Sequence, residues 1–152
     1  MKTVLRKVLF MMAVAAGMLA VLTGCDDEKK IKTKDLPGAA REFITQYFPG
    51  LNVLHAEKDR DDRAVTYNVR LSDGTEIEFD ESGEWISVDC NLSPVPDGIV
   101  PDAVHTHLAS YVPGGTRIFK IEKVWGGYEI EIQDGRDLIY DAEGNFVRED
   151  RG

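Results

Sequence analysis

The sequence holds few residues whose type and spacing favour catalysis or metal binding. His105 and His107 form an H-x-H pair. On a helix, side chains two residues apart point about 200° apart, so this pair cannot share a metal ion. Cys90 has no neighbour that would activate its thiol, and the chain has no G-x-S-x-G motif or glycine-rich phosphate loop. We therefore expect no enzymatic activity, no metal site and no cofactor.

Closely spaced carboxylates offer the other route to chemistry. The segment "DRDD" at 59–62 is dense in carboxylates but lacks the glycine and the terminal glutamate of an EF-hand loop. Glu76 and Glu78 invite comparison with a glycosidase pair, although carboxylates two residues apart are also typical of the polar side of a strand. Binding of a small ligand or of a divalent cation, such as calcium at 59–62, therefore stays an alternative function.

Hydrophobic periodicity predicts the elements that carry these residues. Apolar residues recur every three or four positions over 36–48 and over 100–112, and each segment ends at Pro-Gly, which stops a helix. Apolar and polar residues alternate over 65–71 and 128–132, which is the pattern of a half-buried strand. Each helix is thus followed by strands.

Two blocks of sequence occur twice in the same order. "LPGAAREFITQYFPG" (36–50) aligns with "VPDAVHTHLASYVPG" (100–114), and "YNVRLSDGTEIEFDESGEW" (67–85) aligns with "YEIEIQDGRDLIYDAEGNF" (128–146). The second pair contains Asp-Gly steps, which are typical of tight hairpin turns. An internal repeat is therefore predicted.

The repeat leads to a predicted α+β fold, a tandem repeat of a helix plus a four-stranded antiparallel meander, with both helices packed on one sheet face. We expect the first repeat at 35–89, a proline-rich connector at 90–99 and the second repeat at 100–150. Residues 35–150 are expected to form one compact body, with two independent units as the alternative.

The N-terminal segment predicts export. Basic residues precede an apolar run from Val8 to Leu22, as in a secretory signal peptide, and the run is shorter than the ~20 residues of a spanning helix. A membrane-anchoring helix is the alternative. The sequence Leu22-Thr23-Gly24-Cys25 resembles a bacterial lipobox, which implies removal of residues 1–24 and acylation of Cys25.

The residues after Cys25 predict a flexible, charged tether over 25–34. "CDDEKK" resembles the tags that some Gram-negative lineages use to send lipoproteins to the cell surface, whereas an aspartate after the cysteine retains lipoproteins at the inner membrane in other lineages. We expect a protein secreted across the inner membrane and anchored by lipid in the envelope, with the outer membrane as its destination and the leaflet open.

Charge excludes one class of partner. The formal charge of the whole chain is −9, and Lys2, Arg6 and Lys7 lie in the predicted leader, so the mature part carries −12. A nucleic acid needs a basic surface, so we expect no nucleic-acid partner. Repulsion from anionic headgroups is expected to hold so acidic a domain off the membrane.

The doubled pattern behind a lipoprotein leader resembles the β-lactamase-inhibitor-like, PepSY-like family. The resemblance rests on "YFPG" and "YVPG" followed by Tyr, Asp-Gly, an aromatic residue before Asp, and Gly before an aromatic residue, and it spans residues 34–150. It implies helix-plus-sheet units and a sheet surface that clasps an enzyme. By a looser likeness, PepSY domains restrain secreted peptidases. An unknown protein partner, basic or a secreted enzyme, is therefore expected.

The strand residues that alternate with the core predict where that partner binds. We expect a polar, acidic sheet face opposite the helices, and Trp125 lies at a glycine-flanked tip where aromatic anchors are often energetic hot spots. Ordinary solvation of this face is the alternative. The candidate partner-binding residues are Arg70, Glu76, Glu78, Trp125, Glu129 and Glu131.

Overall fold

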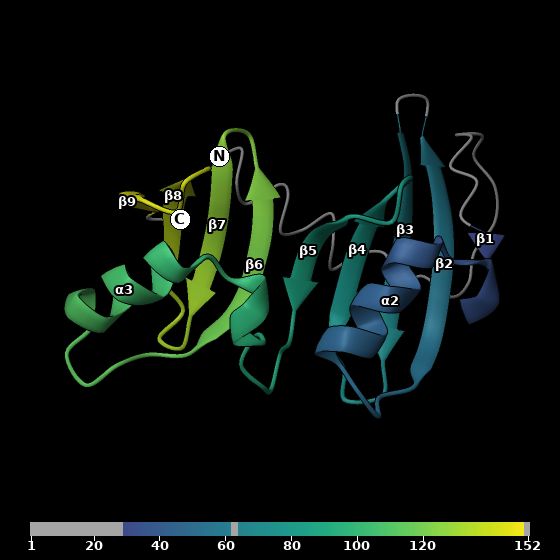
Figure 1. Cartoon of the computed structure of the whole chain (residues 1–152), viewed down its shortest axis with the longest axis horizontal. Coiled ribbons are helices and arrows are strands. Elements are labelled where there is room, and N and C mark those ends of the chain that lie inside the picture. The colour runs from purple at the N-terminus through teal and green to yellow at the C-terminus, as the bar shows by residue number, and fades with distance from the viewer. Residues whose placement is uncertain (1–28, 62–63, 151–152) are drawn as a thin grey trace, which may run out of the picture.

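The fold is described by a computed structural model that covers residues 29–61 and 64–150 (Figure 1). The predicted signal peptide 1–24 and Cys25 lie outside the described residues. Within these residues the structure contains two ten-residue helices and nine strands, with single turns of 3-10 helix at Thr33–Asp35 and Asp97–Ile99. The helices are α2 (Gly38–Tyr47) and α3 (Asp102–Tyr111). The strands are β1 (Lys29–Lys30), β2 (Val53–Asp61), β3 (Ala64–Leu71), β4 (Glu76–Asp80), β5 (Trp85–Asp89), β6 (Ile118–Val124), β7 (Gly127–Ile132), β8 (Asp137–Asp141) and β9 (Phe146–Asp150).

Both helices lie where hydrophobic periodicity predicts them and over the same face of the sheet (Figure 1). Each follows a proline, which cannot donate a backbone hydrogen bond and therefore suits the start of a helix. The helix α2 buries Ala40 and Ile44, and α3 buries Val104 and Leu108. The spacing of four residues places each pair on one side of its helix, so each helix packs through a narrow apolar stripe.

The predicted α+β class, a tandem repeat of helix plus four-stranded meander, is wrong. The nine strands belong to one antiparallel sheet in the order β1 to β9, and with two short helices in the described part of the chain the fold is mostly β. The strands β5 and β6 pair directly, with Ser87 opposite Glu122 and Val88 opposite Ile121. Pairing of these two strands leaves no unpaired edge in the middle of the molecule, where exposed backbone groups would invite aggregation. The alternation of apolar and polar residues along a strand predicts which side chains lie on each face of the sheet, but not which other strand pairs with it.

The tight turn between β4 and β5 packs closely against the start of α2. The turn between β4 and β5 contains Gly83, whose φ is +90°, and a Cβ added there would lie 2.8 Å from Cβ of Pro37. Only glycine accommodates both the positive φ and this close approach to the start of α2. The carboxylate of Asp80 accepts hydrogen bonds from the backbone N–H groups of Ser82 and Glu84, at 2.9 and 3.0 Å, and so fixes the turn.

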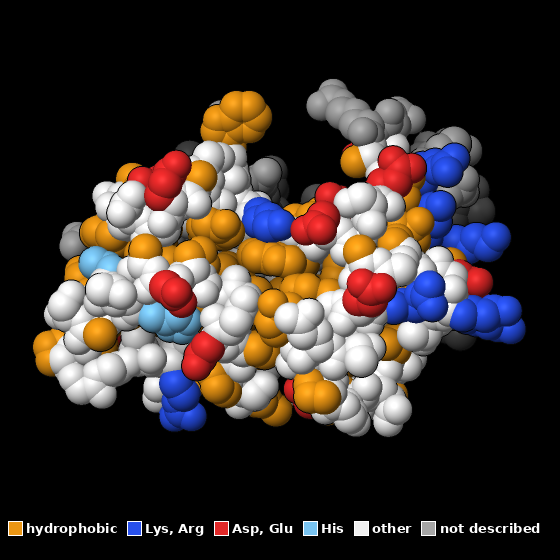
Figure 2. Space-filling model, in the orientation of Figure 1, with side chains coloured by type: hydrophobic (Ala, Val, Ile, Leu, Met, Phe, Trp, Pro, Cys, Tyr) orange, Lys and Arg blue, Asp and Glu red, His pale blue; other side chains and the backbone are white. Residues whose placement is uncertain are grey.

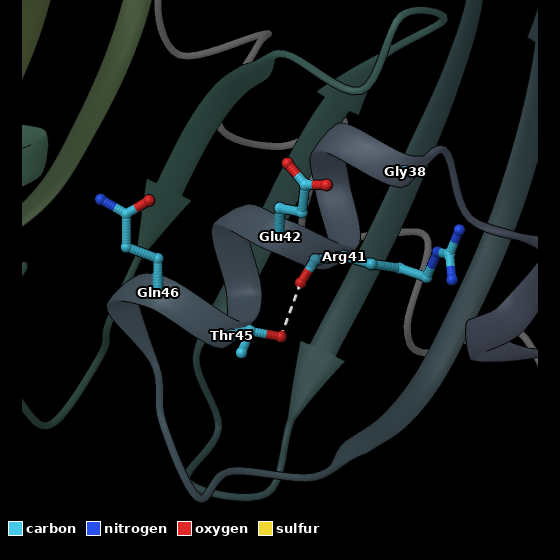
Figure 3. Close-up of a pocket in the computed structure, with 5 residues that line it drawn as sticks. All are labelled: Gly38, Arg41, Glu42, Thr45 and Gln46. Carbon is cyan, nitrogen blue, oxygen red and sulfur yellow. Dashed lines mark hydrogen bonds between the residues drawn. The ribbon is translucent and has the colours of Figure 1, made fainter.

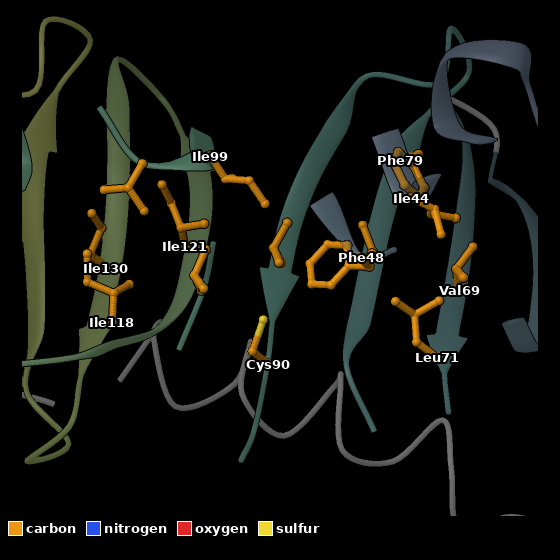
Figure 4. Close-up of a cluster of buried hydrophobic side chains, with 14 of the residues drawn as sticks. Ile44, Phe48, Val69, Leu71, Phe79, Cys90, Ile99, Ile118, Ile121 and Ile130 are labelled. Carbon is orange, nitrogen blue, oxygen red and sulfur yellow. The ribbon is translucent and has the colours of Figure 1, made fainter. Parts of the chain in front are cut away.

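One hydrophobic cluster lies between the sheet and the two helices and runs from β2 to β8, and Figure 4 shows a part of it. Phe79, Ile121 and Tyr140 are almost completely buried in it. The connector before α3 joins the cluster through Ile99, and the Tyr47 hydroxyl of α2 donates a hydrogen bond to the Gly98 carbonyl at 3.3 Å. The core therefore fixes the relative positions of all strands that carry the candidate site.

Candidate binding surface

The side of the sheet without helices presents two continuous rows of mostly polar side chains. Because strand residues alternate between faces, cross-strand partners of a polar residue are on the same side and form a row perpendicular to the strands. The first row consists of Glu57, Asn68, Glu78, Ser87, Glu122, Glu129, Ile139 and Arg148. The second row consists of His55, Arg70, Glu76, Asp89, Lys120, Glu131, Asp137 and Asp150. We call this surface the open face.

The structure places five of the predicted binding residues on the open face, but in different electrostatic settings. Arg70 is opposite Glu76 and donates hydrogen bonds to its Oε1, from Nε at 3.0 Å and from Nη2 at 2.5 Å. Glu131 is opposite Lys120. Glu129, by contrast, faces another carboxylate, Glu122, directly across the strand pair. Ion pairs reach both rows, because Arg70 pairs with Glu76 in the second row and Lys120 Nζ lies 3.1 Å from Oε2 of Glu122 in the first. Among the described residues no ion pair is formed with Glu78 or Glu129, so negative charge is least compensated around these two carboxylates.

Ionisation of two carboxyl groups in the first row, those of Glu78 and Glu129, is less favourable than in water. The pKa of Glu78 is raised above its ordinary value, first because the carboxyl is removed from water and then because Glu122 and Asp59 repel its charge. The pKa of Glu129 is raised as well, by burial and then by repulsion from Asp137 and Glu122, although Lys120 opposes the shift. A positive charge placed over this row would relieve that repulsion.

Sequence alternation missed Lys120 and Glu122, which lie at the centre of the open face. The strand β6 contains a bulge between Ile118 and Lys120, so Ile118 and Ile121 are buried on the same side although they are three residues apart. A bulge inserts one residue and shifts the two-residue period. The signal that could have found these two residues is the regular alternation that resumes from Lys120 onward.

Trp125 stands at the tip of the hairpin between β6 and β7. Its side chain is fully exposed, with a relative accessibility of 102%, and it is followed by Gly126 with a φ of +80°. The C-terminal end of β2 and the N-terminal end of β3 lie at the same end of the sheet as this tip (Figure 1). Trp125 thus offers a large apolar surface to a partner. The other tryptophan, Trp85, is partly buried and stacks on Tyr128 at a centroid distance of 6.4 Å.

The thiol of Cys90 and the imidazoles of His105 and His107 are the groups that could take part in catalysis, and each is buried or contacts another group of the protein. Burial raises the pKa of the Cys90 thiol to about 11, which keeps it protonated at neutral pH. His107 lies in an aromatic cluster at the core edge, and its Nδ1 is 2.9 Å from the Tyr140 hydroxyl. His105 Nε2 lies 3.5 Å from the Asp97 carbonyl oxygen, so the two histidines face different surroundings.

The part of the chain that the structure describes was also compared with the requirements of a metal site, a ligand pocket and a membrane-spanning helix. Over residues 29–61 and 64–150, no three His, Cys, Asp or Glu side chains are placed to hold a metal ion. Figure 3 shows an open hollow along the outer side of α2, where Arg41 extends away from Glu42 and the Thr45 hydroxyl donates to the Arg41 carbonyl at 2.9 Å. In the same residues, no helix is long and apolar enough to cross a membrane.

An antiparallel sheet with helices on one side and a charged open face on the other defines the structural class of the protein. The sequence profile of the family described as "Putative beta-lactamase-inhibitor-like, PepSY-like" matches residues 65–148. The chain belongs to this PepSY-like family, as the doubled motif predicts. A search of curated proteins found no match.

Solved structures of similar proteins come from Bacteroides species. A "putative periplasmic protein" of Bacteroides vulgatus is 34% identical, with a TM-score of 0.78 over 84% of this chain and 100% of that one. A second protein of the same species, described as of unknown function, is 30% identical, with a TM-score of 0.77 over 82% and 99%. A "putative calcium-regulated periplasmic protein" of Bacteroides thetaiotaomicron is 31% identical, with a TM-score of 0.78 over 84% and 100%. The family is therefore represented among proteins described as periplasmic.

Proposed function

We propose that this chain is a non-enzymatic, lipid-anchored envelope protein that binds another protein through its open face. Acylation at Cys25 would anchor it, with the outer membrane as the proposed location and the leaflet open. The periplasmic description of its relatives supports an envelope location. An inhibitor-like action on a secreted enzyme is the form of binding that the family description favours.

The observation that carries this proposal is the poorly compensated negative charge around Glu78 and Glu129 in the first row. Glu122 and Glu129 face each other, and the pKa values of Glu78 and Glu129 are raised because their ionised forms are poorly stabilised. Lysine or arginine side chains of a partner would compensate these carboxylates, so complementarity selects a basic surface. Trp125, at the tip of the β6–β7 hairpin of the same sheet, would add apolar contact area as an anchor.

Crosslinking in intact cells, with the native anchor in place, tests the proposal. A partner captured by the wild-type chain should be lost or strongly reduced with Glu129→Gln/Glu131→Gln and with Trp125→Ala, because truncating an interface anchor costs about 2 kcal/mol or more. Two controls are matched to these changes. Leu92→Ala removes another exposed apolar side chain, with a relative accessibility of 88%, and Glu143→Gln removes an exposed carboxylate from a turn.

The pH dependence of binding provides a second readout. A cationic partner lowers the raised pKa values of Glu78 and Glu129, so binding releases protons and affinity should increase as pH rises through those pKa values. Equal recovery of the partner with the open-face variants and with both controls would refute binding through this face.

A divalent cation remains a second candidate ligand, since one relative is described as calcium-regulated. Asp59 supplies an observation in its favour, because its buried Oδ1 has no hydrogen-bond partner and its charge raises the pKa of the Glu78 carboxyl. Calcium takes about six to eight oxygens, so water or a partner would have to complete such a site. Calorimetry with Ca²⁺ should give heat that Asp59→Asn abolishes, and absence of heat with the wild-type chain would remove this candidate.

A further inference from the structure

Five lysines gather at the end of the sheet that carries β1, and we call them the lysine cluster. Figure 2 shows Lys and Arg side chains collected at this end of the molecule. Together with Ile31, Asp35 and Tyr67, four of the five line an open cleft of about 570 Å³, which has room for a phosphate-bearing headgroup. The lysine cluster consists of Lys29, Lys30, Lys32, Lys34 and Lys58.

The positive charge of the lysine cluster is not neutralised within the part of the chain that the structure describes. No lysine of the cluster has a carboxylate within 4.0 Å there, whereas four lysine and arginine residues elsewhere do. Those four are Arg70, Lys120, Arg136 and Arg148. Lys29 and Lys58 lie directly opposite each other on β1 and β2, an arrangement of like charges that destabilises a sheet. An external anion would relieve this repulsion.

Two carboxylates adjacent to the cluster in sequence make contacts other than ion pairs with its lysines. Asp35 accepts a hydrogen bond from the backbone N–H of Lys32 at 3.2 Å, and Glu57 lies 2.7 Å from Nε2 of His55. The unpaired charge is therefore a property of this end of the sheet rather than of one long, mobile side chain.

We propose that the lysine cluster docks onto the anionic phosphate headgroups of the membrane that holds the protein. This inference rests on the proposed lipid anchor at Cys25, because Lys29 follows Cys25 by only four residues. Four residues span at most about 14 Å, so the acyl chains bring the cluster close to the bilayer surface. Each lysine within a Debye length, about 8 Å at physiological salt, favours the docked state about fivefold.

The charge distribution gives the docked state a defined orientation. Residues 26–28 carry a formal charge of −3, residues 29–35 hold four lysines and one aspartate for +3, and residues 36–152 carry −12. Net charge alone predicts repulsion from an anionic membrane, but the field of the membrane falls off within a Debye length. Attraction therefore acts on the lysine cluster itself, while repulsion turns the acidic body away. The open face is then held clear of the bilayer and accessible to a partner.

Lysine acetylation of the acylated protein in vesicles tests this docking, with the extent of modification at each lysine measured by mass spectrometry. In vesicles of phosphatidylcholine plus about 30% phosphatidylglycerol, the cluster should react about threefold or more slowly than in phosphatidylcholine alone. Lys120 and Lys123 in β6 are internal controls and should react equally in both. Added salt at about 1 M should abolish the difference, because it shortens the Debye length to about 3 Å.

A variant with Lys29→Gln and Lys58→Gln should lose much of the protection at the remaining lysines of the cluster, whereas Lys123→Gln should keep it. Flotation with neutral vesicles reports the anchor independently, so loss of anchoring and loss of docking are distinguishable. Equal reactivity of the cluster in both vesicle types overturns the docking proposal. Protection by inorganic phosphate in neutral vesicles also overturns it, because the cleft would then bind a free anion.

Discussion

Replacing Glu129 by glutamine should make the protein more stable at neutral pH. Glu129 faces Glu122 across the β6–β7 pair, and its pKa is raised by burial and by repulsion from Asp137 and Glu122. Like charges directly opposite in a sheet cost roughly 0.2–1 kcal/mol, and Glu129→Gln removes one of them without changing the shape of the side chain. The free energy of unfolding should therefore increase by that amount.

The corresponding shift in melting temperature follows from the size of the protein. About 120 folded residues at ~2.1 cal/mol/K each give an unfolding entropy of about 0.25 kcal/mol/K. A gain of about 0.2–1 kcal/mol thus raises Tm by about 1–4 °C in calorimetry at pH 7. A carboxyl with a raised pKa in the folded state destabilises the fold increasingly as pH rises from its ordinary value of 4.5 through the raised pKa, and the effect vanishes below the ordinary value. At about pH 4 the variant and the wild type should consequently melt together.

Two further variants isolate the cause. Glu131 lies opposite Lys120, so Glu131→Gln removes an attraction and should leave Tm unchanged or lower it at pH 7. In a Glu122→Gln background, Glu129→Gln should gain less than it does alone, because the repulsive pair is already broken. A Tm of Glu129→Gln equal to or below that of the wild type at pH 7, or the same gain at both pH values, would refute the electrostatic reasoning.

Three other expectations concern the scaffold. Gly127→Ala should cost about 3 kcal/mol in urea unfolding, since the new Cβ would lie 2.7 Å from the carbonyl carbon of Asp141; a loss below about 1 kcal/mol would contradict this close approach. Cys90, with a pKa of about 11, should react with a disulfide reagent at pH 8 only after unfolding, and rapid labelling of the native protein would count against its burial. Tyr140→Phe should cost about 1 kcal/mol by removing the hydrogen bond to His107, and unchanged stability would show that this bond adds nothing.

The sequence predicted local features well because each depends on a short pattern. Both helices begin after a proline and end before Pro-Gly, and Gly74 adopts the positive φ, +91°, that its Asp-Gly step indicates. Alternation of Tyr67 and Val69 with polar residues placed the apolar side chains in the core. These features depend on sterics and periodicity within a few residues.

The sequence failed where the outcome depends on contacts between distant segments. Nothing in strand alternation predicts that Val88 pairs with Ile121, which joins all strands into one sheet and overturns the predicted fold class. The bulge after Ile118 hid Lys120 and Glu122 from the predicted open face. The sequence identified the candidate residues as positions on one face of the sheet. Only the register of the strands shows which of them lie opposite an unlike charge and which lie opposite a like charge.

The order of the strands in the sheet has a consequence for how the chain folds. From β1 to β9, every strand hydrogen-bonds only with its neighbours in sequence, so no strand waits for a distant segment to arrive. Folding rates fall as the average sequence separation of contacting residues grows, and a meander keeps that separation short for a sheet protein. Such a sheet can grow strand by strand as the polypeptide is delivered from its N-terminus, with each new hairpin extending a template that is already in place.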